Sequence, residues 1–186
     1  MGKKLLLIKG GPRANGVTNQ MLESLRQQAS ASGWECSFYD IYEMPLMSCT
    51  GCRTCRKTGI CIMSDDVSDV RKQLLECDVV ALAAPTYFAN VPEPVKNLFD
   101  RLSGAVLDEN AKPKQNKEQQ YILLTACATK PPFDILAGQS TGAIRAMKEF
   151  FKMAGMKNLG KVVCAGASPD KQISSKTKSQ IGSLMP

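Results

Sequence analysis

Short apolar runs alternate with amphipathic segments along the 186 residues of this chain. The most apolar run, 78-DVVALAA-84, has the composition of a strand that is covered on both faces of a sheet. Strands that alternate with helices in this way are typical of a parallel sheet with helices on both sides. We therefore expect an α/β fold with three layers and a doubly wound, five-stranded parallel sheet.

The apolar runs predict five strands, over residues 3–9, 34–40, 78–84, 120–126 and 160–166. Helices are predicted between them, at about 18–31, 64–76, 95–104 and 138–154, and a short helix in the tail 167–186. Ser64, Asp65 and Asp66 are expected to cap the second helix. Residues 105–118 are polar and basic and are expected to form a loop. No repeat or linker divides the sequence, so we expect one domain over 1–186, with a cysteine-rich loop at about 44–63.

The composition excludes several classes of function. The net charge is +7 and the chain has no histidine, which rules out a Ser–His or Cys–His catalytic pair. Lys and Arg are spread along the chain without a long basic block, so no nucleic-acid partner is expected. The N-terminal apolar run 5-LLLI-8 is too short for a signal-peptide core, and no run could span a bilayer. We expect a cytoplasmic protein that has no membrane partner.

Four of the eight cysteines fall within thirteen residues, in the segment 48-SCTGCRTCRKTGICIMSDD-66. Cys49, Cys52, Cys55 and Cys61 have the spacing C-x2-C-x2-C-x5-C. Two C-x2-C steps suit a [4Fe–4S] cluster. Zinc is a second possible occupant, although zinc sites usually join two separated cysteine pairs, and thiols that bind no metal are a third reading. A disulfide knot conflicts with a reducing compartment.

Ligands of doubly wound sheets bind outside the carboxyl ends of the strands, which brings the loops 10–18, 85–93 and 126–134 together. The first loop is Gly-rich and precedes a helix, so it suits a phosphate group. It matches neither G-x-x-x-x-G-K-[ST] nor G-x-G-x-x-G, which disfavours a nucleoside triphosphatase or a standard dinucleotide fold. The second loop carries Tyr87 and Phe88 and no charge, so it suits a flat heteroaromatic ring.

Three stretches give the chain a specific resemblance: GGPRANGVTNQ after the first strand, the cysteine segment with its following DD, and PTYFANVPEPVKNLFDR. In this order they resemble the flavodoxin-like family of NAD(P)H-dependent FMN reductases, over nearly the whole chain and more weakly after about residue 165. The resemblance implies the strand order 2-1-3-4-5. The cysteine pattern is similar to that of the iron–sulfur flavoproteins within this family, which carry FMN and a [4Fe–4S] cluster.

The resemblance also implies functional residues. The FMN phosphate would be held by residues of the first loop, which are Gly11, Arg13, Asn15, Thr18 and Asn19. The isoalloxazine ring would meet residues of the second loop, which are Pro85, Thr86, Tyr87, Phe88 and Asn90, and its other side would be lined by Thr125, Ala126 and Cys127. The cluster would be bound by Cys49, Cys52, Cys55 and Cys61. The chain departs from the family at Gly11, where Ser is common, and at residues 126–128, where Gly-rich sequence is usual.

The function implied is that of an NAD(P)H-dependent oxidoreductase whose chemistry takes place at FMN, with no catalytic side chain. Electrons would pass through the cluster to an acceptor such as a ferredoxin, a quinone or another small oxidant. A homodimer or homotetramer is the assembly that the resemblance implies. The alternatives are a cluster-free NAD(P)H:FMN or quinone reductase, a flavodoxin-like electron carrier without turnover of its own, and a metal-stabilised binding module.

Overall fold

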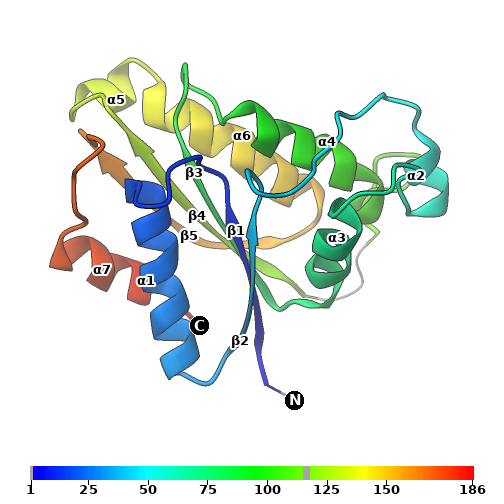
Figure 1. The fold of residues 1–186 in the computed structure, drawn as a ribbon, viewed down its shortest axis with the longest axis horizontal. Helices are drawn as coiled ribbons and strands as arrows, with labels where there is room; N and C mark the ends of the chain where they lie inside the picture. The colour runs from blue at the N-terminus through cyan, green and yellow to red at the C-terminus, as the bar shows by residue number, and fades with distance from the viewer. Residues whose placement is uncertain (1, 115–117) are drawn as a thin grey trace.

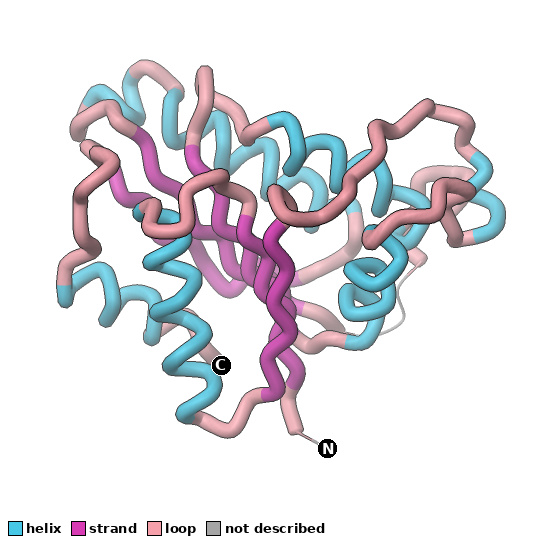
Figure 2. The backbone as a smooth tube through the Cα atoms, viewed as in Figure 1, coloured by secondary structure: helices cyan, strands magenta, loops and turns pink. Residues whose placement is uncertain are grey.

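The computed structural model describes residues 2–114 and 118–186, and its centre is a five-stranded parallel sheet in the order β2-β1-β3-β4-β5 (Figures 1 and 2). The strands are β1 (Lys4–Lys9), β2 (Glu35–Asp40), β3 (Val79–Pro85), β4 (Gln120–Cys127) and β5 (Lys157–Ala165). Every neighbouring pair is parallel. The predicted flavodoxin-like fold class and strand order are confirmed.

Seven helices lie in the described part of the chain: α1 (Val17–Ala31), α2 (Thr54–Thr58), α3 (Val67–Glu76), α4 (Glu93–Val106), α5 (Phe133–Leu136), α6 (Gln139–Met153) and α7 (Ser175–Gly182). None of these helices combines the length and the apolar character that a membrane span requires. The loop expected over 105–118 includes residues 115–117, which lie outside the described residues.

The helices cover the sheet on both faces, because successive strand residues point to opposite sides. On one face, Leu5 and Leu7 pack with Met21 and Leu25 of α1. On the other face, Leu6 and Ile8 belong to the core that includes α3, α4 and α6. Helix α7 lies beside α1, where its Ile181 is fully buried, so the short helix predicted in the tail takes part in the core.

Strand β5 begins at Lys157, three residues before the predicted start. Its register against β4 is interrupted between Tyr121 and Ile122, where Leu159 is an extra residue on the β5 side. Lys157 and Asn158 are exposed at the sheet edge. The residues before Gly160 therefore show no apolar run, and the sequence pattern misses this part of the strand.

The sequence pattern did not predict helices α2 and α5, and it predicted a shorter helix than α4. Helix α4 begins at Glu93 rather than at residue 95, because Pro94 occupies its first turn, where a missing N–H costs nothing. The short helices α2 and α5 lie inside segments predicted as loops. Both span five residues or fewer, which is too short for a detectable apolar periodicity.

Candidate functional site

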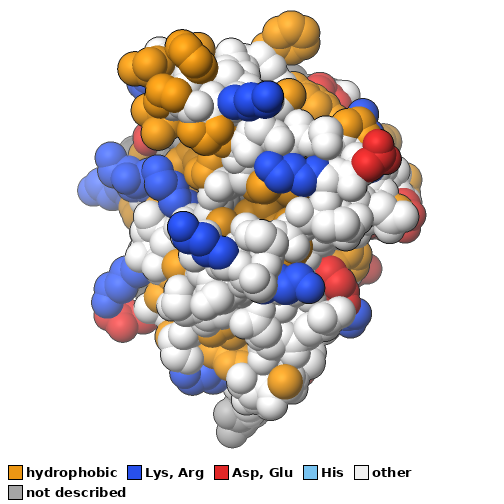
Figure 3. Space-filling view, turned by 90° about the vertical axis from the view of Figure 1, so that its left-hand side faces the viewer, with side chains coloured by type: hydrophobic (Ala, Val, Ile, Leu, Met, Phe, Trp, Pro, Cys, Tyr) orange, Lys and Arg blue, Asp and Glu red, His pale blue; other side chains and the backbone are white. Residues whose placement is uncertain are grey.

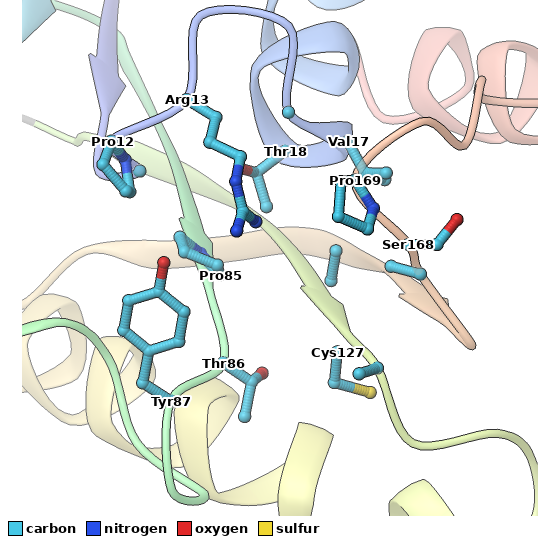
Figure 4. A pocket seen from close by; sticks show the side chains of 15 residues that line it. Pro12, Arg13, Val17, Thr18, Pro85, Thr86, Tyr87, Cys127, Ser168 and Pro169 are labelled. Atoms are coloured by element: carbon cyan, nitrogen blue, oxygen red, sulfur yellow. The ribbon is translucent and has the colours of Figure 1, made fainter.

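A cavity of about 360 Å³ opens at the carboxyl edge of the sheet, where the loops after β1, β3, β4 and β5 meet (Figure 4). Its lining residues are Gly11, Pro12, Arg13, Gly16, Val17, Thr18, Pro85, Thr86, Tyr87, Ala126, Cys127, Ala128, Ala167, Ser168 and Pro169. The predicted site residues that reach the cavity are Gly11, Arg13, Thr18, Pro85, Thr86, Tyr87, Ala126 and Cys127. The three loops expected to meet do meet here.

One end of the cavity is electrically suited to an anion. Helix α1 begins there, with Gly16 at its N-cap and no side chain capping the first turn, so the backbone N–H groups of that turn are free to bind a ligand. Arg13 points its guanidinium into the cavity (Figure 4). Among the described residues that line the cavity there is no Asp or Glu. This end fits a phosphate group.

Gly11 lies in tight packing around the same loop. A Cβ atom at this position would lie 3.1 Å from Cδ of Pro85 and 3.2 Å from Oγ1 of Thr18. Both neighbours also line the cavity, so a side chain at residue 11 would press on its wall. A side chain at residue 11 would require Pro85 or Thr18 to shift by a few tenths of an ångström.

The other wall is formed where β3 and β4 end. The ladder continues one step beyond β3, because the Thr86 N–H donates to the carbonyl oxygen of Ala126 over 2.8 Å. Thr125 is fully buried beneath this wall and does not line the cavity. Its Oγ1 donates to the Ala84 carbonyl oxygen over 2.7 Å and lies 3.2 Å from Oγ1 of Thr86. Thr125 therefore positions Thr86.

The loop after β3 is a tight two-residue turn. The backbones of Tyr87 and Asn90 exchange hydrogen bonds of 2.8 and 2.9 Å. Phe88 and Ala89 between them have φ angles of 50° and 57°, the left-handed conformation that such turns require. Phe88 is fully exposed, and the Asn90 side chain accepts a hydrogen bond from the Val91 N–H over 2.8 Å. Phe88 and Asn90 thus lie outside the cavity, while the turn brings Tyr87 to it.

The two asparagines of the first loop also lie outside the cavity lining. The Asn19 side chain donates to the carbonyl oxygen of Ala14, and the carbonyl oxygen of Asn15 accepts from Gln20 over 2.9 Å. These bonds hold the loop against the first turns of α1. Both residues act on the loop conformation in this structure.

Cys127 contributes a thiol to the cavity lining. Burial raises its pKa, and the nearby Asp134 carboxylate raises it further. The thiol is therefore neutral near pH 7 and is a small apolar contact for a bound ring.

Sequence reasoning missed the segment 167–169, which closes the cavity beyond β5. Gly166 adopts a φ of 63°, and the Ala167 N–H donates to the carbonyl oxygen of Cys127 over 2.8 Å. These features fold the chain back over the end of β4. The carboxyl-edge rule that selected the other loops could also have pointed to the residues after the fifth strand.

The cysteine loop, which contains α2, lies over helices α3 and α4 (Figure 1). Helix α2 lies at the opposite end of the molecule from α5, which follows β4 (Figure 1). The backbone N–H of Cys49 donates to Oδ1 of Asn97, and Nε of Arg101 donates to Sγ of Cys61 over 3.3 Å. The N–H of Thr54 lowers the pKa of the exposed Cys52 thiol. All four cysteines have free thiols.

Asp65 and Asp66 were expected to be helix caps, and the structure corrects this. Asp65 forms a buried, bidentate ion pair with Arg101, with both N–O distances at 2.6 Å. Its Oδ1 also accepts from the Val67 N–H over 3.3 Å, which is the capping part of its role. Asp66 occupies the N-cap of α3 but its side chain makes no cap bond. The sequence could not reveal a partner 36 residues away.

The donor set of the cysteine loop is right for an iron–sulfur cluster, but its arrangement is not. Within residues 2–114 and 118–186, no three Cys, Asp or Glu side chains come together closely enough to hold one metal ion. As the thiols lie, they do not form a cluster site.

Relatives of known type match this chain. The family model described as NADPH-dependent FMN reductase matches residues 3–127. An iron-sulfur flavoprotein of Archaeoglobus fulgidus is 34% identical over 99 residues, which is 53% of this chain and 45% of that protein. The chain spans about half the length of the curated relatives it first matches.

Solved structures with the same fold include an NAD(P)H:quinone oxidoreductase from Methanothermobacter marburgensis. It has a TM-score of 0.76 and 16% identity, covering 98% of this chain and 92% of that one. An FMN-dependent NADH-azoreductase from Bacillus anthracis, in complex with FMN, has a TM-score of 0.74 and 10% identity, covering 97% and 96% of the two chains. The fold, the cavity and the family match over 3–127 together identify this chain as a member of the NADPH-dependent FMN reductase family.

Proposed function

We propose that this chain binds FMN in the cavity at the carboxyl edge of the sheet and acts as an NAD(P)H-dependent oxidoreductase. The observation that carries the proposal is a cavity that joins a free helix N-terminus and Arg13 to a wall of Pro85, Ala126 and Cys127, with no carboxylate in its lining. Its charged end suits a phosphate group, and its uncharged wall suits a flat ring.

FMN, when bound, accepts two electrons and a proton as hydride from NAD(P)H and passes the electrons to an acceptor. The first turn of α1 and Arg13 bind the phosphate and fix the position of the ligand. Thr86, held by Thr125, and the turn that carries Tyr87 orient the ring. The acceptor we propose is a quinone, a ferredoxin or another small oxidant.

Binding is tested by titrating the ligand-free protein with FMN and with riboflavin, which lacks the phosphate. Arg13→Ala should weaken FMN binding by about tenfold, the worth of one charge-assisted hydrogen bond, and leave riboflavin binding unchanged. Arg26→Ala is the matched control, since Arg26 lies on α1 but pairs with Glu23 at the surface. An equal loss for both ligands would contradict the assigned phosphate position.

Turnover is tested by following NADH and NADPH oxidation by the FMN-loaded protein with quinone acceptors. Sustained oxidation is expected. An electron carrier without turnover is the competing function, and it would show flavin reduction by a protein donor but no oxidation of either nicotinamide.

We also propose that the cysteine loop binds a [4Fe–4S] cluster once its thiols rearrange. The C-x2-C-x2-C-x5-C spacing and the relatives named iron-sulfur flavoproteins support this. Protein purified without oxygen should contain iron and acid-labile sulfide, and Cys55→Ser should lose both, whereas Cys36→Ser outside the loop should keep them. If wild-type protein contains no more iron than Cys55→Ser, the cluster is refuted and the chain is a cluster-free reductase.

A second copy of the chain is the partner we propose at the rim of the cavity. Large apolar side chains are exposed on the turn after β3 and on α5, namely Phe88, Phe133, Ile135 and Leu136. Figure 3 shows an apolar patch at the top of this side of the molecule, above a surface with more Lys and Arg than acids. Sedimentation of the FMN-loaded protein should give a dimer or tetramer, and a monomer at every concentration would contradict this.

A further inference from the structure

Three residues on one face of α4 contact three different cysteines of the loop. Asn97, Arg101 and Gly104 are spaced i, i+4 and i+7, which places them on the same side of a helix. They meet Cys49, Cys61 and Cys55 respectively. The loop is thus built against a surface from elsewhere in the chain rather than folded on itself.

Arg101 is the centre of this face, and its side chain has no exposed surface. Its guanidinium donates to the carbonyl oxygen of Met47 over 2.6 Å, to both carboxylate oxygens of Asp65, and to Sγ of Cys61. Met47 precedes the first cysteine, and Asp65 follows the last. One side chain therefore ties together both ends of the cysteine segment.

The neighbours of Arg101 complete the contact. Asn97 accepts from the Cys49 N–H over 3.0 Å and donates to the Met47 carbonyl oxygen over 3.3 Å. At Gly104, a Cβ atom would lie 2.4 Å from the backbone carbon and oxygen of Cys55. Only glycine lets the loop backbone approach α4 this closely.

We propose that Asn97, Arg101 and Gly104 form a docking face on α4 that sets the conformation of the cysteine loop, with Arg101 as its central positioning residue. The face holds the loop without any metal, and it presents Cys49, Cys55 and Cys61 along one side of α4. Its effect on metal loading rests on the cluster proposed above. Its effect on the loop itself does not.

The metal-free full chain gives the first test. The amides of Met47, Cys49 and Gly59 donate hydrogen bonds in the docked loop, so their hydrogen exchange reports docking. In Arg101→Gln these amides should exchange at least about tenfold faster, because the variant leaves the Asp65 carboxylate buried without its partner. Trypsin should cleave after Arg53, Arg56 and Lys57 faster in the same proportion.

The matched control is Arg145→Gln, the same change at an exposed position on α6. Arg101→Lys separates charge from geometry, since lysine keeps the charge and lacks the planar fork; it should resemble Gln. If Arg101→Gln proves unfolded, Gly104→Ala gives the same readout with every Arg101 bond kept. Hydrogen exchange of these amides at the wild-type rate, in Arg101→Lys or in a folded Gly104→Ala, would overturn the proposal that this face docks the loop.

Iron loading gives the second test. After anaerobic reconstitution with iron and sulfide, Arg101→Gln should retain less than about a tenth of the wild-type iron, because the thiols can turn toward one another only while the docked backbone keeps three of the four cysteines beside α4. FMN affinity should be unchanged, because no residue of the docking face lines the flavin cavity. Full iron content in Arg101→Gln would overturn the positioning role. A wild-type protein that takes up no iron would refute the proposed cluster, while the exchange experiment still decides the docking face.

Discussion

The turn between Tyr87 and Asn90 is held in place by a close approach to α6, which can be blocked by one methyl group. A Cβ atom at Gly142 would lie 1.9 Å from the carbonyl oxygen of Ala89 and 2.9 Å from its carbonyl carbon. Carbon and oxygen atoms that are not bonded rarely come closer than about 3 Å, so in Gly142→Ala the turn must retreat by about 1 Å. Tyr87 would then leave its place in the cavity wall.

The magnitude follows from two opposed effects. Forcing a methyl group into a packed contact costs about 1–3 kcal/mol. Alanine inside a helix is favoured over glycine by about 1 kcal/mol, which offsets part of that cost. We expect a net destabilisation of about 1 kcal/mol and a loss of FMN affinity of about tenfold, since the ring contacts move with the turn.

The assay is a thermal melt together with an FMN titration of Gly142→Ala. The matched control is Gly182→Ala, where the nearest atoms to the added methyl all belong to the movable end of the Gln28 side chain, with Oε1 at 2.1 Å. The control should keep wild-type FMN affinity. Unchanged melting temperature and FMN affinity in Gly142→Ala would refute the claim that this contact positions the turn.

Three further predictions follow from the same structure. Ala89→Gly should stabilise the protein by up to about 1 kcal/mol in thermal melts, because it relieves a left-handed φ of 57° in a non-glycine residue. Burial opposes ionisation of Asp65, but hydrogen bonds from Arg101 outweigh it and hold the pKa of this carboxyl below its ordinary value. The stability that the ionised Asp65 contributes should therefore be present above about pH 4 and fall as the pH drops below that. Acid titrations should show this loss in wild type but not in Asp65→Asn. Burial raises the pKa of the Cys127 thiol, so its contribution to the stability of the fold should be intact below about pH 8.5 and lost at higher pH. Iodoacetamide should label Cys127 far more slowly than the exposed Cys52, as mass spectrometry of the labelled peptides would measure.

The sequence pattern predicted the layers of the fold well because that information is local. The apolar run of β3 and the amphipathic repeat of α1 are each encoded within a few neighbouring residues. The flavodoxin-like order came from the resemblance of three motifs and is confirmed by the sheet. The alternation itself excluded all-β and all-α folds.

Within the site, the sequence correctly brought the loops after β1, β3 and β4 to one cavity, since all parallel strands end at the same edge. It could not tell which residues of a loop face inward. Phe88 and Asn90 lie outside because the turn between them has a left-handed backbone, and Thr125 lies beneath the wall rather than in it. Residues 167–169 enter the cavity only because the chain folds back after β5.

The sequence by itself determined the alternation of the strands with the longer helices, the carboxyl-edge position of the cavity and the presence of four clustered thiols. Only the tertiary structure decided where those thiols lie. Arg101 and Asp65 are 36 residues apart, and their buried pairing turns the cysteine loop onto α4 and away from the cavity lining. Such a pairing depends on the packing of α3 against α4, so the physical reason is that no pattern among neighbouring residues encodes it.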